Sequence, residues 1–160
     1  MSEMNHNKSS KLFVALATIF ILLCAIGETM PASASSAVGT VQKMSGPASI
    51  VRQGETISAS VGQEIFENDV LKTDRDGSMG VAFSDDTLLS LGPESVLVVD
   101  QYVFAPRQGK FSIVLRMLRG TAAYLSGLIS KLAPESAHFE TPSASIGIRG
   151  THFVVKVQER

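Results

Sequence analysis

Turn-forming residues interrupt the chain so often from Val38 onward that long helices are excluded there. The pairs Asp76-Gly77, Asp85-Asp86 and Gly92-Pro93 each separate two short apolar runs, a pattern typical of strands and tight turns. These runs begin about nine residues apart, a spacing that suits a β-roll or solenoid of stacked short strands and suits a sandwich equally. The sequence therefore predicts an all-β fold built of short strands.

Two segments of the second half depart from this pattern. Residues 111–117 are apolar on both faces except at Ser112 and Arg116, which predicts a central strand covered on two sides. After Gly120, four apolar residues follow helical spacing as far as Pro134: Leu125, Leu128, Ile129 and Leu132. They predict one short helix near residues 125–133, packed on the core of the domain.

The first 34 residues have the features of an export signal. Two lysines precede an apolar run at residues 12–26, and the small-x-small cleavage site Ala32-Ser33-Ala34 follows. An uncleaved anchor is disfavoured, because a helix of that run reaches only about 22 Å of the roughly 30 Å hydrocarbon core. We therefore expect a signal peptide at residues 1–34, membrane contact through that signal alone, and a mature domain at residues 35–160 that is periplasmic or secreted.

The predicted mature domain must be stable without disulfides, because the one cysteine of the chain, Cys24, lies in the signal. A chain of about 125 residues can bury roughly two thirds of its unfolded surface, so one core and one domain are expected. Its cations are mixed with acidic residues, and residues 107–110 and 116–119 are only short basic clusters. Nucleic-acid binding requires clustered cations, so no nucleic-acid partner is expected.

The sequence contains no catalytic or cofactor motif that we can identify. It has no G-x-S-x-G nucleophile elbow and no glycine-rich phosphate loop before a helix. His138, Glu140 and His152 could form a metal site of two histidines and one carboxylate, although surface histidines are the simpler interpretation. We expect no enzyme activity, no cofactor and no metal.

Acidic residues in several turns suggest a second kind of metal site, one that binds calcium. Residues 67–69, 74–77 and 85–86 could offer oxygen ligands to calcium if they lined one side of stacked strands, but no complete EF-hand pattern is present. Asp and Asn are also common in turns because of their local hydrogen bonds. A structural or wall-associated β module that binds glycan or calcium is therefore kept as the alternative function.

The closing segment TPSASIGIRGTHFVVKV, residues 141–157, changes the face of its apolar alternation halfway along. Ile146 and Ile148 share one parity, whereas Phe153 has the other. A β-bulge at Gly150 would explain the change, because glycine accepts a positive φ and a bulge inserts an extra residue into a strand.

Two further expectations concern the same segment. Thr141-Pro142 is expected to begin its strand, where proline costs no ladder hydrogen bond. Arg149 would then bond the backbone groups that the bulge leaves unpaired, and binding of a partner's carboxylate is the alternative.

The closing segment also carries a resemblance to a known family. ETPSASIGIRGTHFVV resembles the closing signature of the FecR-type periplasmic domain of ferric-citrate-type regulators, in which Thr-Pro, a small residue and Arg-Gly-Thr precede the last strand. Three earlier stretches resemble other parts of that domain in the same order: VGTVQKMSGPASIVRQG, VGQEIFENDVLKT and VAFSDDTLLSLGPESVLVV. The residues that match the closing signature are Thr141, Pro142, Gly147, Arg149, Gly150 and Thr151.

Some positions depart from the family pattern. Asn68 and Asp86 stand where glycine is usual, and both residue types tolerate the left-handed conformation. Only 11 residues precede the apolar run, so we expect the cytoplasmic anti-sigma segment of those regulators to be lacking. The resemblance implies an exported, non-enzymatic domain at residues 35–160 that binds or signals in the cell envelope through contact with another envelope protein.

Overall fold

The computed structural model describes residues 36–150 and 152–158. The chain divides into two compact units, Met1–Ala34 and Ser35–Arg160, and the predicted signal peptide lies outside the described residues. The described part of the second unit is all-β with one short α-helix, as predicted. Within these ranges no helix is long and apolar enough to cross a membrane.

The strands follow one another with turns at the predicted positions. The first seven are β1 (Gly39–Ser45), β2 (Ala48–Arg52), β3 (Glu55–Ser58), β4 (Glu64–Ile65), β5 (Val70–Thr73), β6 (Ser78–Phe83) and β7 (Leu88–Leu91). The others are β8 (Val96–Ala105), β9 (Lys110–Leu125), β10 (Ala137–Thr141), β11 (Ala144–Gly147) and β12 (His152–Val157). The helical elements are η1 (Pro106–Gln108), α2 (Ile129–Leu132) and η2 (Pro134–Ser136).

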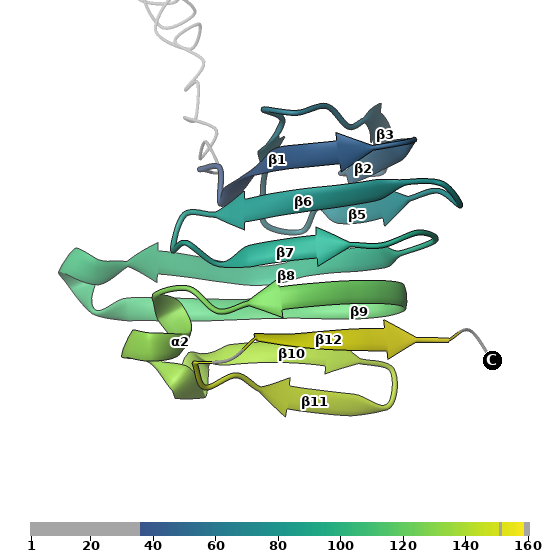
Figure 1. Cartoon of the computed structure of the whole chain (residues 1–160). Coiled ribbons are helices and arrows are strands. Elements are labelled where there is room, and N and C mark those ends of the chain that lie inside the picture. Colours follow the sequence, from purple (N-terminus) through teal and green to yellow (C-terminus); the bar gives the residue numbers. More distant parts are fainter. Residues whose placement is uncertain (1–35, 151, 159–160) are drawn as a thin grey trace, which may run out of the picture. The chain divides into compact units, whose positions relative to one another are not determined.

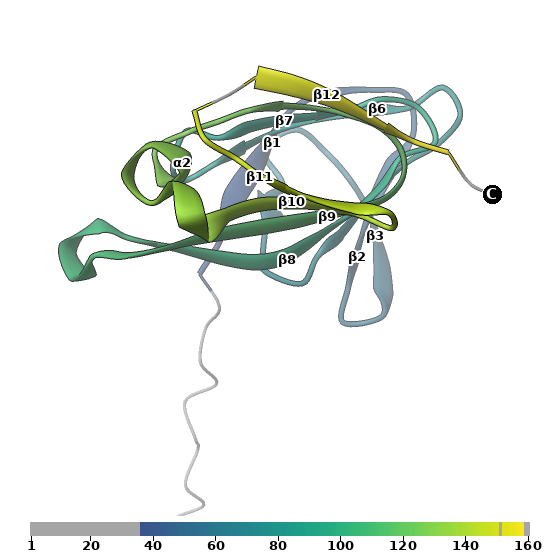
Figure 2. The same cartoon turned by 90° about the horizontal axis from the view of Figure 1, so that it is seen from below.

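The strands form one curled sheet whose two layers face each other (Figures 1 and 2). One layer has the order β4-β1-β6-β7-β9-β12, and the other has the order β3-β2-β5-β8-β9-β10-β11. All described strand pairs are antiparallel except β9 with β10, which are parallel because α2 and η2 carry the chain across between them. Of the two predicted arrangements, the sandwich is the nearer, since the strands do not stack as rungs of a coil.

The long strand β9 belongs to both layers. As far as Arg119 it pairs with β8, and from Gly120 to Leu125 it pairs with β12. Gly120 has a φ of 91°, and a Cβ on it would lie 2.3 Å from the Ser95 hydroxyl oxygen. Glycine is therefore needed where the strand passes from one layer to the other.

The strand predicted at residues 111–117 is central in the sheet, as expected, but it is not covered on both faces. The first part of β9 is paired on both edges, with β8 and with β10. Its burial alternates, however: Ile113, Leu115 and Met117 are fully buried, whereas Arg116 is exposed. Two layers enclose one core between them, so the outer face of β9 has no layer over it.

The α-helix is shorter than the predicted range of residues 125–133. Leu125 ends β9 instead, where it pairs with Leu88 on one side and with His152 on the other. Only Ile129–Leu132 is helical, with Ile129 buried and Leu132 59% exposed. Hydrogen bonding to two neighbouring strands thus outweighs the helical spacing of the apolar residues at Leu125.

The change of face in the closing segment has a different cause from the predicted bulge. β11 pairs with β10, whereas β12 pairs with β9, so the residues between them cross from one layer to the other and each strand has its own inward face. Gly150 does have a positive φ, of 59°. The expectation that Thr141-Pro142 begins a strand is also wrong, because Thr141 ends β10 and Pro142 lies in the tight turn before β11.

Two other turn predictions are confirmed. Asn68 and Asp86 have φ values of 69° and 65°, so each holds the left-handed conformation that glycine would otherwise supply. Both lie between strands, and the residue after Asn68 and the residue before Asp86 turn inward and are fully buried.

Replacing Gly120 by alanine tests the claim that the crossing point of β9 requires glycine. We expect Gly120→Ala to lower the free energy of unfolding by roughly 3 kcal/mol, from the strained φ and the contact with Ser95 together. Gly109→Ala is the matched control, because Gly109 has a φ of 63° but a Cβ on it would meet nothing within 4 Å. It should cost only about 1 kcal/mol, and equal losses in urea unfolding would contradict the account.

Candidate functional site

The residues that match the family signature lie at one end of the sheet, on β10, β11 and the chain that follows them (Figure 1). The Thr141 hydroxyl donates to the Ala144 carbonyl at 3.1 Å and accepts from the Ala144 N–H at 3.0 Å, which fixes the turn between these strands. Four signature residues are exposed: Pro142, Gly147, Arg149 and Gly150. Thr151 lies outside the described residues, and the role of Arg149 in bonding backbone groups stays a prediction.

β11 and β12 leave the sheet unclosed at this end, which we call the open end (Figure 2). No ladder joins the two strands, because each has one described pairing partner, β10 for β11 and β9 for β12. A hollow of about 250 Å³ lies between them and is lined by Ile146, Ile148, Phe153 and Val155, among others. Phe153 and Val155 contact the core but stay only half-buried. The open end therefore combines an apolar interior with free strand edges.

Three aromatic rings hold the open end to the core. Phe153 stacks on Tyr124 with ring centroids 5.2 Å apart and meets Phe139 edge to face at 5.5 Å. Tyr124 and Phe139 are fully buried and also meet edge to face, at 6.2 Å. Such pairs add about 1 kcal/mol each beyond their buried area, so β12 is fixed by its inner face, while no described strand pairs with its outer edge.

Asp85 is the centre of a buried hydrogen-bond network. Its carboxylate accepts from the Thr87 hydroxyl at 2.8 Å, the Tyr102 hydroxyl at 3.1 Å and the Ile129 N–H at 3.1 Å. Asp85, Thr87 and Ile129 are fully buried, and Tyr102 is 7% exposed. The network ties the β6–β7 turn to β8 and to the first turn of α2, and satisfies a carboxylate that would otherwise be costly to bury.

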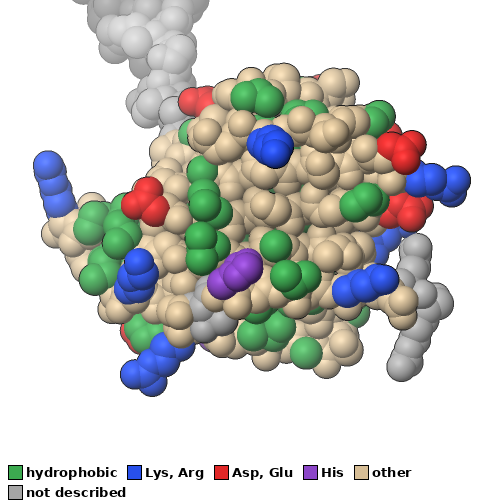
Figure 3. All heavy atoms as spheres, viewed as in Figure 1, with side chains coloured by type: hydrophobic (Ala, Val, Ile, Leu, Met, Phe, Trp, Pro, Cys, Tyr) green, Lys and Arg blue, Asp and Glu red, His purple; other side chains and the backbone are tan. Residues whose placement is uncertain are grey.

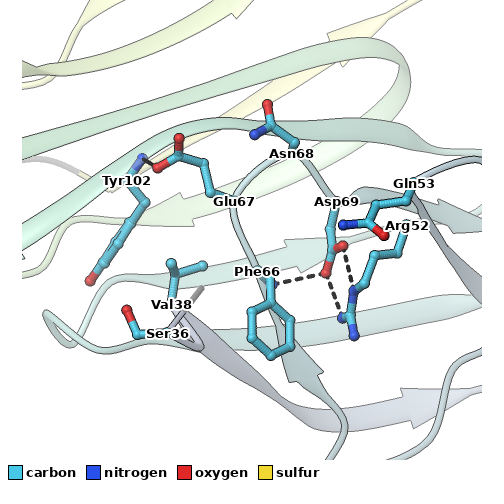
Figure 4. Close-up of a pocket in the computed structure, with 9 residues that line it drawn as sticks. All are labelled: Ser36, Val38, Arg52, Gln53, Phe66, Glu67, Asn68, Asp69 and Tyr102. Carbon is cyan, nitrogen blue, oxygen red and sulfur yellow. Dashed lines mark hydrogen bonds and ion pairs between the residues drawn. The ribbon is translucent and has the colours of Figure 1, made fainter. Parts of the chain in front are cut away.

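A pocket of about 420 Å³ lies beside a second buried carboxylate, Asp69 (Figure 4). Arg52 donates from Nε and Nη2 to the two oxygens of Asp69, each at 2.8 Å, and the Phe66 N–H donates to the same carboxylate at 2.8 Å. The guanidinium carbon lies 4.3 Å from the centroid of the Phe66 ring. The hydrogen bonds to Asp69 raise the pKa of Arg52 above its ordinary value, so the guanidinium stays charged at every physiological pH.

The charged groups around this pocket have a structural role. Asp69 is satisfied by protein donors, and Glu67 accepts the Tyr102 N–H at 3.1 Å. The Arg52 Nη2 also donates to the Glu64 carbonyl at 2.9 Å. The charged groups around the pocket therefore hold β2, β5 and β8 in place, and none of these contacts sets a nucleophile beside a base.

The metal-binding residues considered from the sequence do not come together. His138 and Glu140 lie on β10, whereas the exposed His152 lies on β12. Two of the acids considered for calcium, Asp69 and Asp85, point inward and are hydrogen-bonded within the protein. Over residues 36–150 and 152–158, no group of three His, Cys, Asp or Glu residues is placed to hold a metal ion.

Both tyrosines of the chain are buried near the Asp85 network. Burial raises the pKa of Tyr102 far above its ordinary value, and the Asp85 charge raises it further. Burial also raises the pKa of Tyr124 to about 12. The Tyr124 hydroxyl lies near Thr87 and Ser130 but makes no hydrogen bond of normal geometry with a described residue.

The two buried carboxylates, Asp85 and Asp69, differ in how well the sequence predicts their roles. Phe83, Asp85 and Thr87 occupy alternate positions and are all buried, so a polar residue in the inward register of a strand pair is the signal that could have identified Asp85. Arg52 ends β2 with its side chain 26% exposed, and no sequence pattern links it to Asp69.

The chain was compared with known proteins. Residues 69–160, more than half of the chain, match the family model described as FecR protein. This stretch runs from the buried Asp69 through the signature residues of the open end. No curated protein and no solved structure matches the chain.

The raised tyrosine pKa values predict loss of stability in alkali. Each folded-state pKa lies above the unfolded value of about 10, so the stabilising contribution is complete below pH 10 and is lost as the pH rises toward 12 and beyond. Because the chain has two tyrosines and no tryptophan, near-ultraviolet tyrosinate absorbance follows these two groups alone. Titration near pH 10 in the native protein, as in urea, would contradict the account.

The ion pair of Arg52 with the buried Asp69 should contribute far more to stability than a surface pair. We expect Arg52→Met to lower the free energy of unfolding by about 3 kcal/mol, because it leaves the buried Asp69 carboxylate without its cation. Arg116→Met is the matched control, since Arg116 pairs at the surface with Asp100 and Glu140, and it should cost below about 1 kcal/mol. Urea unfolding measures both, and similar losses would contradict the assignment.

Proposed function

Because the chain belongs to the FecR protein family, we propose that it is an exported module of the cell envelope that binds another protein within a signalling system. The family is one of regulatory signalling domains. In this proposal the chain transmits or receives a signal by contact and performs no reaction. The residues before Ser35 serve as its export signal.

The observation that carries the proposal is the exposure of the signature residues at the open end. A signature that served folding alone would be expected in the core or in tight backbone contacts. Pro142 and Gly150 are exposed and do serve the backbone, the first in a tight turn and the second with a positive φ. Gly147 and Arg149 are exposed as well, and a Cβ on Gly147 would meet nothing within 4 Å. Exposed residues beside an apolar hollow are typical of binding surfaces.

The buried charges support a role in binding over catalysis. Asp69 and Asp85, the two fully buried carboxylates described, are each held by several protein donors. A catalytic carboxylate needs access to a substrate, and an oxygen ligand for calcium needs free lone pairs. These two residues offer neither, so they support neither a catalytic role nor a calcium site.

Photo-crosslinking in intact cells tests the proposed function. The full chain is produced with p-benzoylphenylalanine at one of four exposed hydrophobic positions: Val61, Leu88, Leu132 or Val154. We expect the chain in the envelope fraction and an adduct with one envelope protein from Val154 at the open end. Val61 is the matched control, because Val61 and Val154 are 64% and 62% exposed.

The outcomes separate the parts of the proposal. Retention of the full-length chain in the cytosol would overturn export. Absence of a protein adduct at all four positions, in a chain that is folded and exported, would overturn the binding function. Adducts from Val61 or Leu132 alone would keep the function and move the binding site away from the open end.

A further inference from the structure

We propose that the free edge of β12 binds an extended segment of the partner protein as an added β-strand, and that this segment carries acidic residues. The inference rests on the proposed function and names the binding mode and the chemistry of the partner. It is argued from the unpaired edge of β12, from the hollow beside it and from its charge.

β12 is the longest strand at an edge of the described sheet. It has six residues, whereas the other edge strands, β3, β4 and β11, have four, two and four. In an antiparallel strand that is paired on one side, the N–H and C=O groups of alternate residues face away from the partner. β12 is paired with β9 alone among the described strands, so it offers a row of free backbone groups. Proteins usually keep such edges short or covered.

The hollow at the open end gives an added strand a place for its inward side chains. A strand bound to the free edge of β12 would lie between β12 and β11 and would point every second side chain toward Ile146, Ile148 and Val155. These residues line the hollow of about 250 Å³. Covering them would also complete the burial of Phe153, so the partner segment should have apolar residues at alternate positions.

Charge decides between an acidic partner and a second copy of the chain. Residues 141–157 contain no acidic residue, and the exposed Lys156 lies on the outer face of β12. Lys156 also lines a hollow of about 360 Å³ together with Arg119 and Glu94. Pairing two copies of β12 would place two Lys156 residues on one face without a carboxylate in either strand. An acidic residue opposite Lys156 gives complementary charge instead.

The outer face of the layer that contains β12 is compatible with an added partner strand (Figure 3). Figure 3 shows mainly hydrophobic and other uncharged side chains over its middle, with a histidine and a cation among them, and most charged side chains toward the rim. Leu88 pairs with Leu125, and Ala123 with the exposed Val154. A strand added to β12 would extend this face, with an apolar or small residue beside Val154 and an acidic residue beside Lys156.

The experiment uses the segment that crosslinks from position 154, mapped by mass spectrometry and synthesised as a peptide. Two further peptides carry N-methyl groups at alternate residues, in opposite phase. Because the N–H groups of a strand alternate between its two edges, we expect one phase to weaken binding to the full chain more than tenfold and the other to bind like the parent peptide. Calorimetry measures the dissociation constants.

Charge reversal gives an independent readout with a matched control. Lys156→Glu should weaken binding of the parent peptide at least about fivefold, and a peptide with lysine in place of its acidic residue should restore it. Lys43→Glu is the control, because Lys43 is also exposed in the same layer but lies on β1, and it should leave binding unchanged.

Several results would overturn the inference. These are equal binding of the two N-methylated peptides, equal effects of the two lysine variants, and an adduct at position 154 that is a lipid or a second copy of the chain. Adducts from other positions but none from position 154 would overturn the added strand and leave the proposed function standing. Absence of adducts at every position would overturn both.

Discussion

The backbone hydrogen bonding of a single strand, β9, holds both layers of this sheet together. Its first part lies between β8 and β10, and its second part lies between β7 and β12. The strand can serve both layers because Gly120 supplies a left-handed conformation where the Ser95 side chain leaves no room for a Cβ. Everything at the open end follows from this crossing, since β10 and β12 attach to different parts of β9 and so end in different layers.

Buried polar groups then fix the positions of the strands around β9. Asp85 joins the β6–β7 turn to β8 and α2, and Asp69 joins β5 to β2 through Arg52. A buried carboxylate is costly unless it is fully hydrogen-bonded, so these networks favour one arrangement of the layers over other compact ones. The strands that they tie together contrast with the open end, where apolar residues are half-buried and no described strand pairs with the outer edges of β11 and β12. Binding at the open end therefore needs little change in the rest of the domain.

Local chemistry in the sequence predicts much of this structure. The all-β class, the turns and the left-handed conformations of Asn68 and Asp86 depend on a few neighbouring residues, and the residues of the open end were identified through a family resemblance. The pairing of strands depends on distant residues instead. Asp85 accepts hydrogen bonds from residues 17 and 44 positions away in the sequence. The closing segment forms two strands because its first half pairs with β10 and its second half pairs with β9. For that reason the predictions of a bulge at Gly150 and of a helix that starts at Leu125 were wrong.

The central claim is that the sheet ends at β12 with a free edge. Amide hydrogen exchange measured residue by residue in the folded chain tests this claim most directly. The account predicts strong protection throughout residues 122–125 of β9, which lie between β7 and β12. It predicts an alternating pattern in β12, in which amides facing β9 exchange slowly and those facing away exchange fast. Uniform slow exchange along residues 152–157 would show that another segment already covers this edge and would contradict the account.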